Sequence, residues 1–532
     1  MVRRVVAAVA LLLVLLVWSA PSAAAHAYVI SQSPSSGAEL ATSPAAVVVR
    51  FSEPVTLASG TATSVVSSSG ERVDAGSPVL DGDRLTIPLQ RGLPKGVYVA
   101  NWSVISADSH PVGGSLQFGV GVPTVAVAEP DAPQPSSLLQ LINGVLKGVV
   151  YLGLSVALGA AIAARLLHVS WPRPWLAAGF LAAAIGSLLQ IPVQYLWGAS
   201  ASQATWDGLL QSAGSEYAVT IYLRVALLAL AWAVQRWLPV FAVVAVLVVA
   251  TVVHNGHGGA EGGWVFVSTL AHATAATAWV GGLVVLGWAM LTRRLSVPQL
   301  RRLPLWSRYA GGAVAVIALT GVAQAVVQVR YPAALVHTTY GWVLIAKVVL
   351  VVVAGLFAIL GNRWVREHSV LEDRPAPGET SRLRRFARRE AALGAAVVIV
   401  SGVLSSVDPA QATYAPTTTQ TLTAGPYTVS LRIAPARRGP VGFRVTVTGA
   451  ADATPLAQQV QLTLDQPGGA VRALPVEFTA RIPGTIRSGQ PVPITFVSAV
   501  VVVPDIGDWR AQLTVVASPT EQYSLATDFT AY

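Results

Sequence analysis

Two histidines and an aspartate near the start of the chain have the residue types and spacing of a metal site. Asp108 and His110 are two residues apart in "SVISADSHPVGG", so on a β-strand their side chains point to the same face. His26 follows "PSAAA", which has the small residues of a secretory cleavage site after a basic start and an apolar run. Cleavage after Ala25 would make His26 the first residue of the mature chain.

A terminal histidine can chelate one ion through its α-amine and its own imidazole. His110 would add a third nitrogen and Asp108 an oxygen, and tetragonal N,O coordination is typical of Cu(II) or Ni(II), with copper the stronger binder. The amine must lose its proton to bind, so affinity should fall in acid. Zinc in a tetrahedral site is an alternative. Two further alternatives involve no metal site. The N-terminal apolar segment could be an uncleaved anchor in place of a signal peptide, and Asp108 could form a turn with His110 exposed to solvent.

Three further histidines occur where apolar segments meet the membrane surface. His254 and His257 lie in "TVVHNGHGGAEGG", and His272 lies about two turns inside the next apolar segment. Ionisable residues inside a bilayer are costly and are usually functional, so these three predict a copper-acceptor site at one outward mouth. Helix capping for the first two, and a hydrogen bond to a neighbouring helix for His272, are the structural alternatives. His254 and His272 could also ligate a haem, as in an electron-transfer protein.

The composition indicates an integral membrane protein that carries soluble parts. Of the 532 residues 53% are hydrophobic and only 11% are charged, against about 25% charged in soluble proteins. The absence of cysteine excludes disulfides and thiolate metal sites, and two methionines are too few for a thioether site. The net charge of +10 comes from arginine clusters between apolar runs, which orient membrane helices, so no nucleic-acid partner is expected.

The elements that must position these residues fall into three parts. Short alternating or β-branched runs predict an all-β sandwich at each end of the chain. Between them, apolar segments of about 20 residues predict a bundle of eight transmembrane helices. The predicted parts are a cleaved signal peptide (1–25), a β-sandwich (26–122), a Pro-rich linker (123–137), the eight-helix domain (138–407) and a second β domain (411–532).

Eight crossings place both β domains on the outer side of the membrane and most positive charge inside, as the positive-inside rule requires. The predicted spans are roughly 140–167, 175–197, 219–236, 238–254, 264–291, 308–329, 340–361 and 386–406. Arg224 and Arg330 are the nearest exceptions, because this topology assigns them to the outer side. The boundary between the third and fourth spans, near Pro239, depends on a short Trp-Leu-Pro turn.

Residues 26–122 resemble the CopC family of periplasmic copper-binding proteins. The matching pieces are "HAYVISQSPSSGAEL", "FSEPV" and "WSVISADSHPVGG", which reproduce an N-terminal His, P-x-x-G, F-S-E-P-V and W-x-V-x-S-x-D-x-H-x-x-x-G. The resemblance implies a Cu(II) histidine brace made by His26, Asp108 and His110. Family members that also bind Cu(I) there use Met-rich loops, which this chain lacks.

Residues 138–407 resemble the CopD family of membrane copper proteins. The matching pieces include "HNGHGG", "HATAATAWVGGL", "TTYGWVLIAKVVL" and "GNRW". The resemblance implies eight helices and copper handling, commonly uptake across the inner membrane, with Cu(I) as a further candidate ion in the membrane domain. The tail resembles the small YtkA-like β domain appended to such fusions. A protein that captures Cu(II) outside and passes copper inward is therefore expected; sequestration without transport is an alternative.

No enzymatic activity is expected. The chain has neither a G-x-x-x-x-G-K-[ST] motif nor the D-K-T-G stretch of P-type pumps. Copper braces also occur in oxidative enzymes that leave an axial position open, but here Asp108 is placed to fill the coordination.

Overall fold

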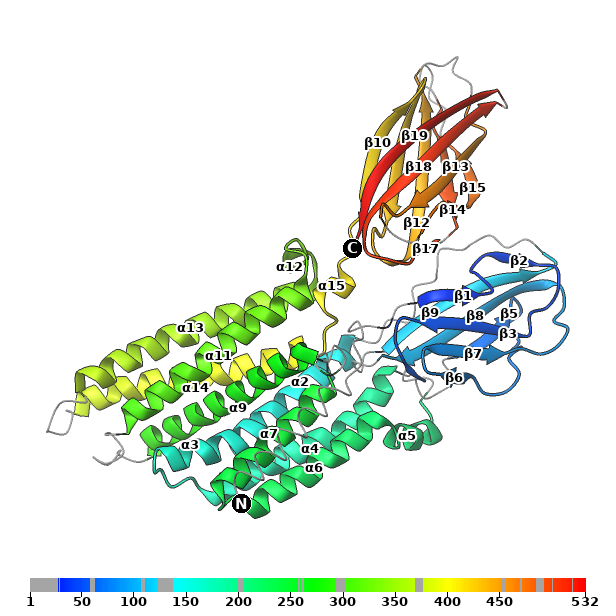
Figure 1. Ribbon diagram of the computed structural model, residues 1–532. Helices are drawn as coiled ribbons and strands as arrows, with labels where there is room; N and C mark the ends of the chain where they lie inside the picture. The colour runs from blue at the N-terminus through cyan, green and yellow to red at the C-terminus, as the bar shows by residue number, and fades with distance from the viewer. Residues whose placement is uncertain are drawn as a thin grey trace.

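The computed structural model consists, in chain order, of an N-terminal β domain, a helical bundle and a C-terminal β domain (Figure 1). It describes the following residues: 27, 29–57, 63–106, 111–122, 137–198, 204–256, 259, 263–292, 302–368, 377–450, 456–468, 471–484, 492–499, 501–518 and 520–532. Both β domains lie at the same end of the bundle. The three-part organisation predicted from the sequence is confirmed.

The N-terminal domain consists of two sheets that share one buried core. Their strands follow an in-out alternation, as in β8, where every second residue from Tyr98 to Val104 is buried. All pairs are antiparallel except β2 with β9. The first sheet has the order β1 (Val29–Ser33), β3 (Ala46–Phe51), β7 (Arg84–Pro88), β6 (Val79–Asp81); the second has β2 (Ala38–Leu40), β9 (Pro111–Val120), β8 (Gly96–Ile105), β4 (Thr56–Leu57), with β5 (Ser64–Ser67) also on β8.

Each of the eight predicted spans coincides with an apolar helix. Among the residues that the structure describes, six helical segments are long and apolar enough to cross a membrane, whereas Leu238–His254 and Ala392–Leu404 are shorter apolar stretches. The number of crossings therefore stays a prediction. The helices are α2 (Ser137–Leu154), continued by the π-helical η1 (Ser155–Gly159) and α3 (Ala160–Leu166), then α4 (Arg173–Gly198), α6 (Glu216–Val234), α7 (Leu238–His254), α9 (Gly263–Thr292), α11 (Leu303–Val329), α13 (Thr339–His368) and α14 (Pro377–Leu404).

Short helices connect or follow these long ones. They are α5 (Trp206–Ala213), α12 (Ala334–His337) and α15 (Ala410–Thr413). The predicted break between the third and fourth spans is present: α6 ends at Val234, and Pro239 lies in the first turn of α7, where its missing N–H has no intrahelical partner to lose.

Glycines let the first membrane segment pack closely on α9. A methyl group added at Gly159 would lie 2.0 Å from the carbonyl oxygen of Thr277, and one at Gly281 would lie 2.3 Å from the backbone nitrogen of Ala160. Such small residues allow helix backbones to approach in the absence of a hydrophobic driving force. The π-helical turn Ser155–Gly159 lies at this crossing.

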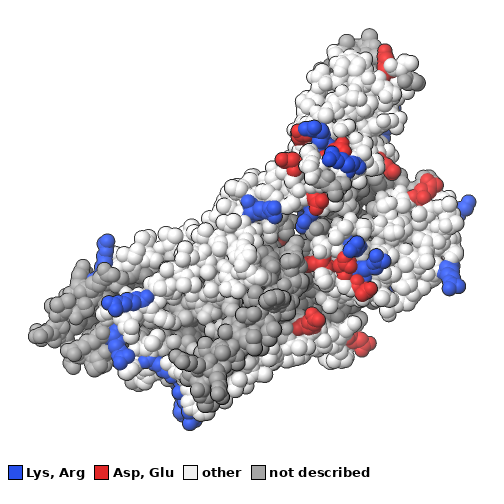
Figure 2. Space-filling model, in the orientation of Figure 1, with Lys and Arg blue, Asp and Glu red and all other residues white. Residues whose placement is uncertain are grey.

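The distribution of charge matches a membrane protein. Figure 2 shows a broad surface without charged side chains along the helices, with Lys and Arg at the end remote from the β domains and mixed charges on the β domains themselves. This is the pattern that the positive-inside rule predicts if the β domains lie outside.

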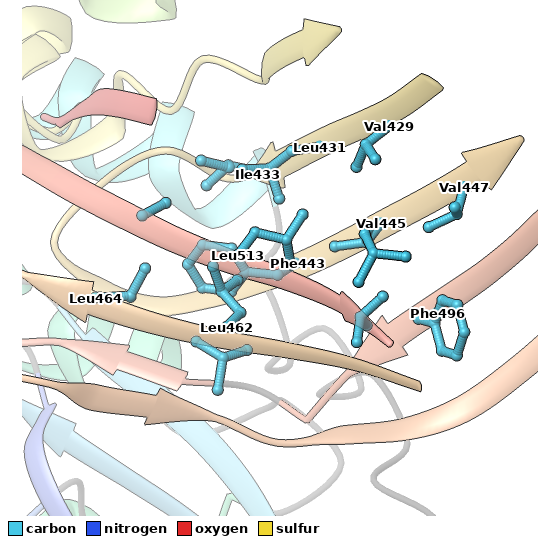
Figure 3. Close-up of a cluster of buried hydrophobic side chains, with 14 of the residues drawn as sticks. Val429, Leu431, Ile433, Phe443, Val445, Val447, Leu462, Leu464, Phe496 and Leu513 are labelled. Atoms are coloured by element: carbon cyan, nitrogen blue, oxygen red, sulfur yellow. The ribbon is translucent and has the colours of Figure 1, made fainter. Parts of the chain in front are cut away.

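The C-terminal domain also has two sheets around a single core. Side chains from both sheets converge in it, including Leu431, Phe443, Leu462 and Leu513 (Figure 3). One sheet has the order β10 (Thr418–Ala424), β11 (Tyr427–Ala434), β12 (Gly439–Gly449), β16 (Ile494–Ser498), β15 (Phe478–Pro483), with β17 (Val501–Val503) on β12; the other has β14 (Leu474–Val476), β13 (Gln459–Asp465), β18 (Gly507–Ser518), β19 (Glu521–Ala531).

Three tyrosine rings join this domain to the helical bundle. The ring centroid of Tyr532 lies 4.9 Å from that of Tyr331 and 5.3 Å from that of Tyr414, and both pairs are in edge-on contact. Tyr331 follows α11 and Tyr414 follows α15, so the contacts attach the end of the sheet to the end of the bundle.

Candidate metal centres

The structure describes the strands that flank the predicted Cu(II) ligands Asp108 and His110. Strand β8 ends at Ile105 and β9 begins at Pro111, and these two residues are paired directly. Asp108 and His110 belong to the connection between them and, like His26, lie outside the described residues. The brace therefore stays a prediction, and what the structure supplies is the framework on either side of it.

The hairpin that carries Asp108 and His110 is held by a buried tryptophan. Trp102 of β8 is 3% exposed, and its ring contacts Phe51 of β3 edge-on at 5.1 Å. Opposite it on β9, a methyl group added at Gly114 would lie 2.2 Å from Cζ2 of Trp102, so the indole occupies the space above the glycine. This contact explains the Trp and the Gly that bound the W-x-V-x-S-x-D-x-H-x-x-x-G pattern.

The first described residues after the predicted cleavage site belong to the same packing. Ala27, next to the predicted terminus, is buried in the domain core, and Val29 pairs with Phe51. Phe51 in turn contacts Trp102, three residues before the end of β8. One aromatic pair thus links the strand after His26 to the hairpin that carries Asp108 and His110.

The same edge of the domain faces the helical bundle. Both β8 and β9 contact α4. Strand β2, which pairs with Phe118–Val120 of β9, lies at the end of the domain away from the helices, so the end formed by Ile105 and Pro111 is the one nearer to them (Figure 1).

The structure places two of the three predicted membrane ligands and separates them. His254 is the last residue of α7 and is exposed, whereas His272 lies in the body of α9 and is half-buried; His257 is outside the described residues. An apolar cluster of α7 (Val249–Val253) and α9 (Phe266–Leu270) joins the two helices. Because the helices are antiparallel, His254 and His272 lie at opposite ends of this cluster, about two turns or ~10 Å apart.

The two histidines therefore lie at different depths, His254 at the end of α7 and His272 within the helical domain. A joint role for them in one metal or haem site stays a prediction.

His272 has a specific partner on α11. Its Nδ1 lies 3.0 Å from Oγ1 of Thr320, whose hydroxyl also donates to the carbonyl of Val316. A methyl group added at the next residue, Gly321, would lie 3.3 Å from Cε1 of the imidazole. The predicted hydrogen bond to a neighbouring helix is therefore present.

A buried polar cluster around Arg224 was not recognised from the sequence. The topology assigned Arg224 to the outer side as an exception to the charge rule, but it is 1% exposed inside α6. Its guanidinium donates to Oγ1 and the backbone oxygen of Thr251, at 3.1 and 3.0 Å, and to Ser187 and Gln190. All four acceptors are neutral. A serine and a glutamine spaced three apart in an apolar helix were the available signal.

Within the described residues, no group of three His, Asp or Glu side chains could hold a metal ion. The site predicted at His26, Asp108 and His110 falls in segments outside the described residues.

Family models match the N-terminal β domain and the later part of the helical domain. The CopC domain model matches residues 29–121, and the Copper resistance protein D model matches residues 300–404. The "Copper transport protein CutJ" of Bacillus subtilis (strain 168) is 28% identical over 503 residues, which cover 86% of this chain and 88% of CutJ. "Protein YobA" of Escherichia coli (strain K12) is 32% identical over 102 residues, 19% of this chain and 82% of YobA.

Among solved structures, CopC from Methylosinus trichosporium OB3b is 32% identical to the matched part. The match covers 18% of this chain and 93% of that protein, with a TM-score of 0.16.

Proposed function

Because the chain belongs to the proteins that carry a CopC domain and a CopD domain in one polypeptide, we propose that it captures Cu(II) outside the cell membrane and passes copper to its transmembrane domain for import. Its relative CutJ is named a copper transport protein and aligns along most of both chains. The helices supply the membrane-spanning part, and we propose that eight cross the membrane with both β domains outside.

The capture site proposed is the brace of His26, Asp108 and His110. The α-amine and imidazole of His26 chelate the ion, His110 adds the third nitrogen, and Asp108 adds an oxygen. The packing of Ala27 in the core and the contact of Phe51 with Trp102 support this proposal, because they hold the neighbouring segments on one framework. Preorganised ligands lose less conformational entropy when the metal binds.

The observation that carries the hand-off is the contact of β8 and β9 with α4. It brings the hairpin that includes Asp108 and His110 to the end of the bundle where the helical domain begins. A tethered donor of this kind works at an effective concentration of the order of millimolar, without diffusing to its acceptor. From there, His254 and His257 at the mouth and His272 about two turns deeper would bind copper in succession.

The capture proposal is tested by blocking the terminal amine. One alanine inserted between Ala25 and His26 should leave export intact and should weaken Cu(II) binding strongly, because the six-membered chelate of the α-amine and the imidazole is lost. Cu(II) binding to the exported protein is measured by competition with a chromophoric chelator, and the first residue is read by mass spectrometry. Unchanged affinity with alanine as the first residue would show that the amine is not a ligand.

The import proposal is tested by cellular copper content under copper limitation. Cells that carry the protein should accumulate more copper than cells that lack it, and His272→Ala should abolish the difference while leaving the Cu(II) affinity of the exported domain unchanged. Lower copper in the cells that carry the protein would contradict import.

A second candidate is sequestration outside the cell without transport. The description of the matched membrane domain as a copper resistance protein favours it. Sequestration predicts less cytoplasmic copper when the protein is present and no effect of His272→Ala, so the same measurement separates the two.

A further inference from the structure

We propose that copper crosses the outer half of the helical domain along a hydrated track between α9 and α11, which ends at His272. This inference rests on the proposed transport function and deepens it by assigning the route. The track is formed by side chains of Ser268, Thr269 and His272 on α9 and of Thr320 and Gln324 on α11.

The register of the two helices brings these side chains together. α9 and α11 pack along their length and are antiparallel, and the bond of His272 with Thr320 defines the pairing. Ser268 and Thr269 lie one turn before His272 on the same face, and Gln324 lies one turn after Thr320. Ser268 and Thr269 therefore face Gln324 about one helical turn nearer the outer end of the bundle than His272.

The polar atoms on this level lack protein partners. In the described part of the chain, Oγ of Ser268, Oγ1 of Thr269 and Nε2 of Gln324 are buried and make no hydrogen bond. Buried polar groups in proteins are almost always paired with protein or with water. Three unpaired groups on one face of one helix pair indicate that water occupies the space between them.

The inner end of the track presents a nitrogen suited to a metal ion. A carbonyl can only accept, so the Thr320 hydroxyl directs its proton to Val316 and accepts from Nδ1–H of His272. The lone pair then resides on Nε2. Hydrogen bonding of one ring nitrogen is the usual way in which a protein orients the other toward a metal.

The surroundings of His272 favour passage over storage. Neither α9 nor α11 contains Asp or Glu, and Lys347 of α13 lies close enough to the imidazole to act on it electrostatically. A cation at His272 would be bound by one strong ligand and repelled by Lys347. Conduction requires binding that is weak enough to release the ion.

The experiment uses single cysteines, because the natural chain has none. Ser268→Cys and Gln324→Cys are compared with Val267→Cys and Val322→Cys, whose native side chains are 51% and 65% exposed on the outside of the bundle, where lipid would lie. The full-length protein in membrane vesicles is treated from outside with a charged methanethiosulfonate. Only a hydrated thiol ionises readily, and each unit of increase in thiol pKa lowers the thiolate fraction about tenfold.

We expect the two track cysteines to react at least about tenfold faster than their lipid-facing neighbours. In the natural, cysteine-free chain, silver ion, used as a non-redox probe for a soft metal, should enter the vesicles, and His272→Ala should abolish that uptake. Equal reactivity of Ser268→Cys and Val267→Cys would overturn the hydrated track. Silver uptake that His272→Ala leaves unchanged would overturn the metal route, whatever the cells' copper content shows about transport.

Discussion

At the scale of single residues, burial and hydrogen bonding determine what a polar side chain does here. Arg224 and His272 both lie inside the helical domain, yet their surroundings differ. Arg224 has its guanidinium occupied by neutral acceptors on two neighbouring helices, so it joins those helices. One ring nitrogen of His272 is hydrogen-bonded to Thr320.

Thr320→Val should impair copper transport, because His272 loses the acceptor that orients its imidazole. A positioning group of this kind typically affects metal affinity by about 10- to 100-fold. Thr320→Ser retains the hydroxyl and should restore transport. Uptake of copper into vesicles measures the effect, and the ¹⁵N shifts of the His272 ring should show a change of tautomer in the valine variant alone. Equal uptake by the valine and serine variants would rule out this role for the hydroxyl.

Asp74 should stabilise the N-terminal domain except in acid. Burial alone would raise the pKa of this carboxyl, but hydrogen bonds from Arg72 and from the backbone N–H of Val65 outweigh it and hold the pKa below its usual value. A carboxyl with a lowered folded-state pKa stabilises the fold above its unfolded pKa of about 3.9, and the contribution is lost as pH falls through the folded value.

The expected result is that Asp74→Asn destabilises the domain by about 1 kcal/mol at pH 7. The difference from the natural chain should shrink as pH falls below about 4. Amide hydrogen exchange of the β5 and β7 peptides in the full-length protein measures both. A difference that persisted unchanged into strong acid would contradict the assignment.

At the scale of elements, glycines decide how closely strands and helices approach. Gly114 admits the indole of Trp102 over β9, and Gly159 and Gly281 admit the backbone of one helix against another. In each case the space that a side chain would fill is already occupied.

Gly114→Ala should destabilise the N-terminal domain by about 1–3 kcal/mol, because the added methyl group overlaps the Trp102 ring. Gly96→Ala on β8 is the matched control: its methyl group would meet Tyr98 at an ordinary 3.8 Å. The protection of β8 and β9 amides from hydrogen exchange measures the stability of the domain. Both this protection and the Cu(II) affinity should fall in the Gly114→Ala variant only. Similar losses in both variants would mean that general strand preference, not the indole, is responsible.

Gly281→Ala should weaken the crossing of α9 over the π-helical turn. The methyl group would lie against backbone atoms of Gly159 and Ala160, which cannot rotate away. The control is Gly355→Ala in α13, which has open space at that position and gains from the better helix propensity of alanine. The thermal unfolding temperature in detergent should drop for Gly281→Ala and stay level or rise for Gly355→Ala. A drop of equal size in both variants would refute the packing argument.

At the scale of the whole molecule, the two β domains share one end of the bundle. The N-terminal domain contacts α4 through β8 and β9, and the C-terminal domain is attached through Tyr532, Tyr331 and Tyr414. The two domains also contact each other, through β1 and β12. The proposed capture and acceptance of copper would therefore both take place at one end of the protein.

Doubling the predicted linker 123–137 with Gly-Ser residues should slow copper transfer without changing capture. Effective concentration falls roughly as the −3/2 power of linker length, so a doubling lowers it about threefold. The rate of vesicle uptake at low copper should decrease by a similar factor, while Cu(II) affinity remains that of the natural chain. Transfer that did not depend on linker length would indicate that the contact with α4 alone holds the domain in place.

Much of the fold was predictable from the sequence because it depends on local periodicity. Alternation of apolar residues marked strands such as β3 and β8, and runs of about 20 apolar residues marked the helices. The break at Pro239 was also a local signal. The candidate ligands were also predicted from local signals, namely the cleavage-site pattern before His26 and the two-residue spacing of Asp108 and His110, and the resemblance to CopC implies the copper brace. Which of them bind copper stays a prediction, because the residues that carry it lie outside the described part of the chain.

Contacts between residues distant in sequence were decided only by the tertiary structure. No local pattern shows that His272 meets Thr320 forty-eight positions away, that Arg224 is surrounded by Ser187, Gln190 and Thr251, or that His254 and His272 lie at different depths. The sequence by itself determined the class of each segment and the chemistry available to it. The packing of helices and sheets determined which groups meet, because distance and burial between separate elements arise only when the chain has folded.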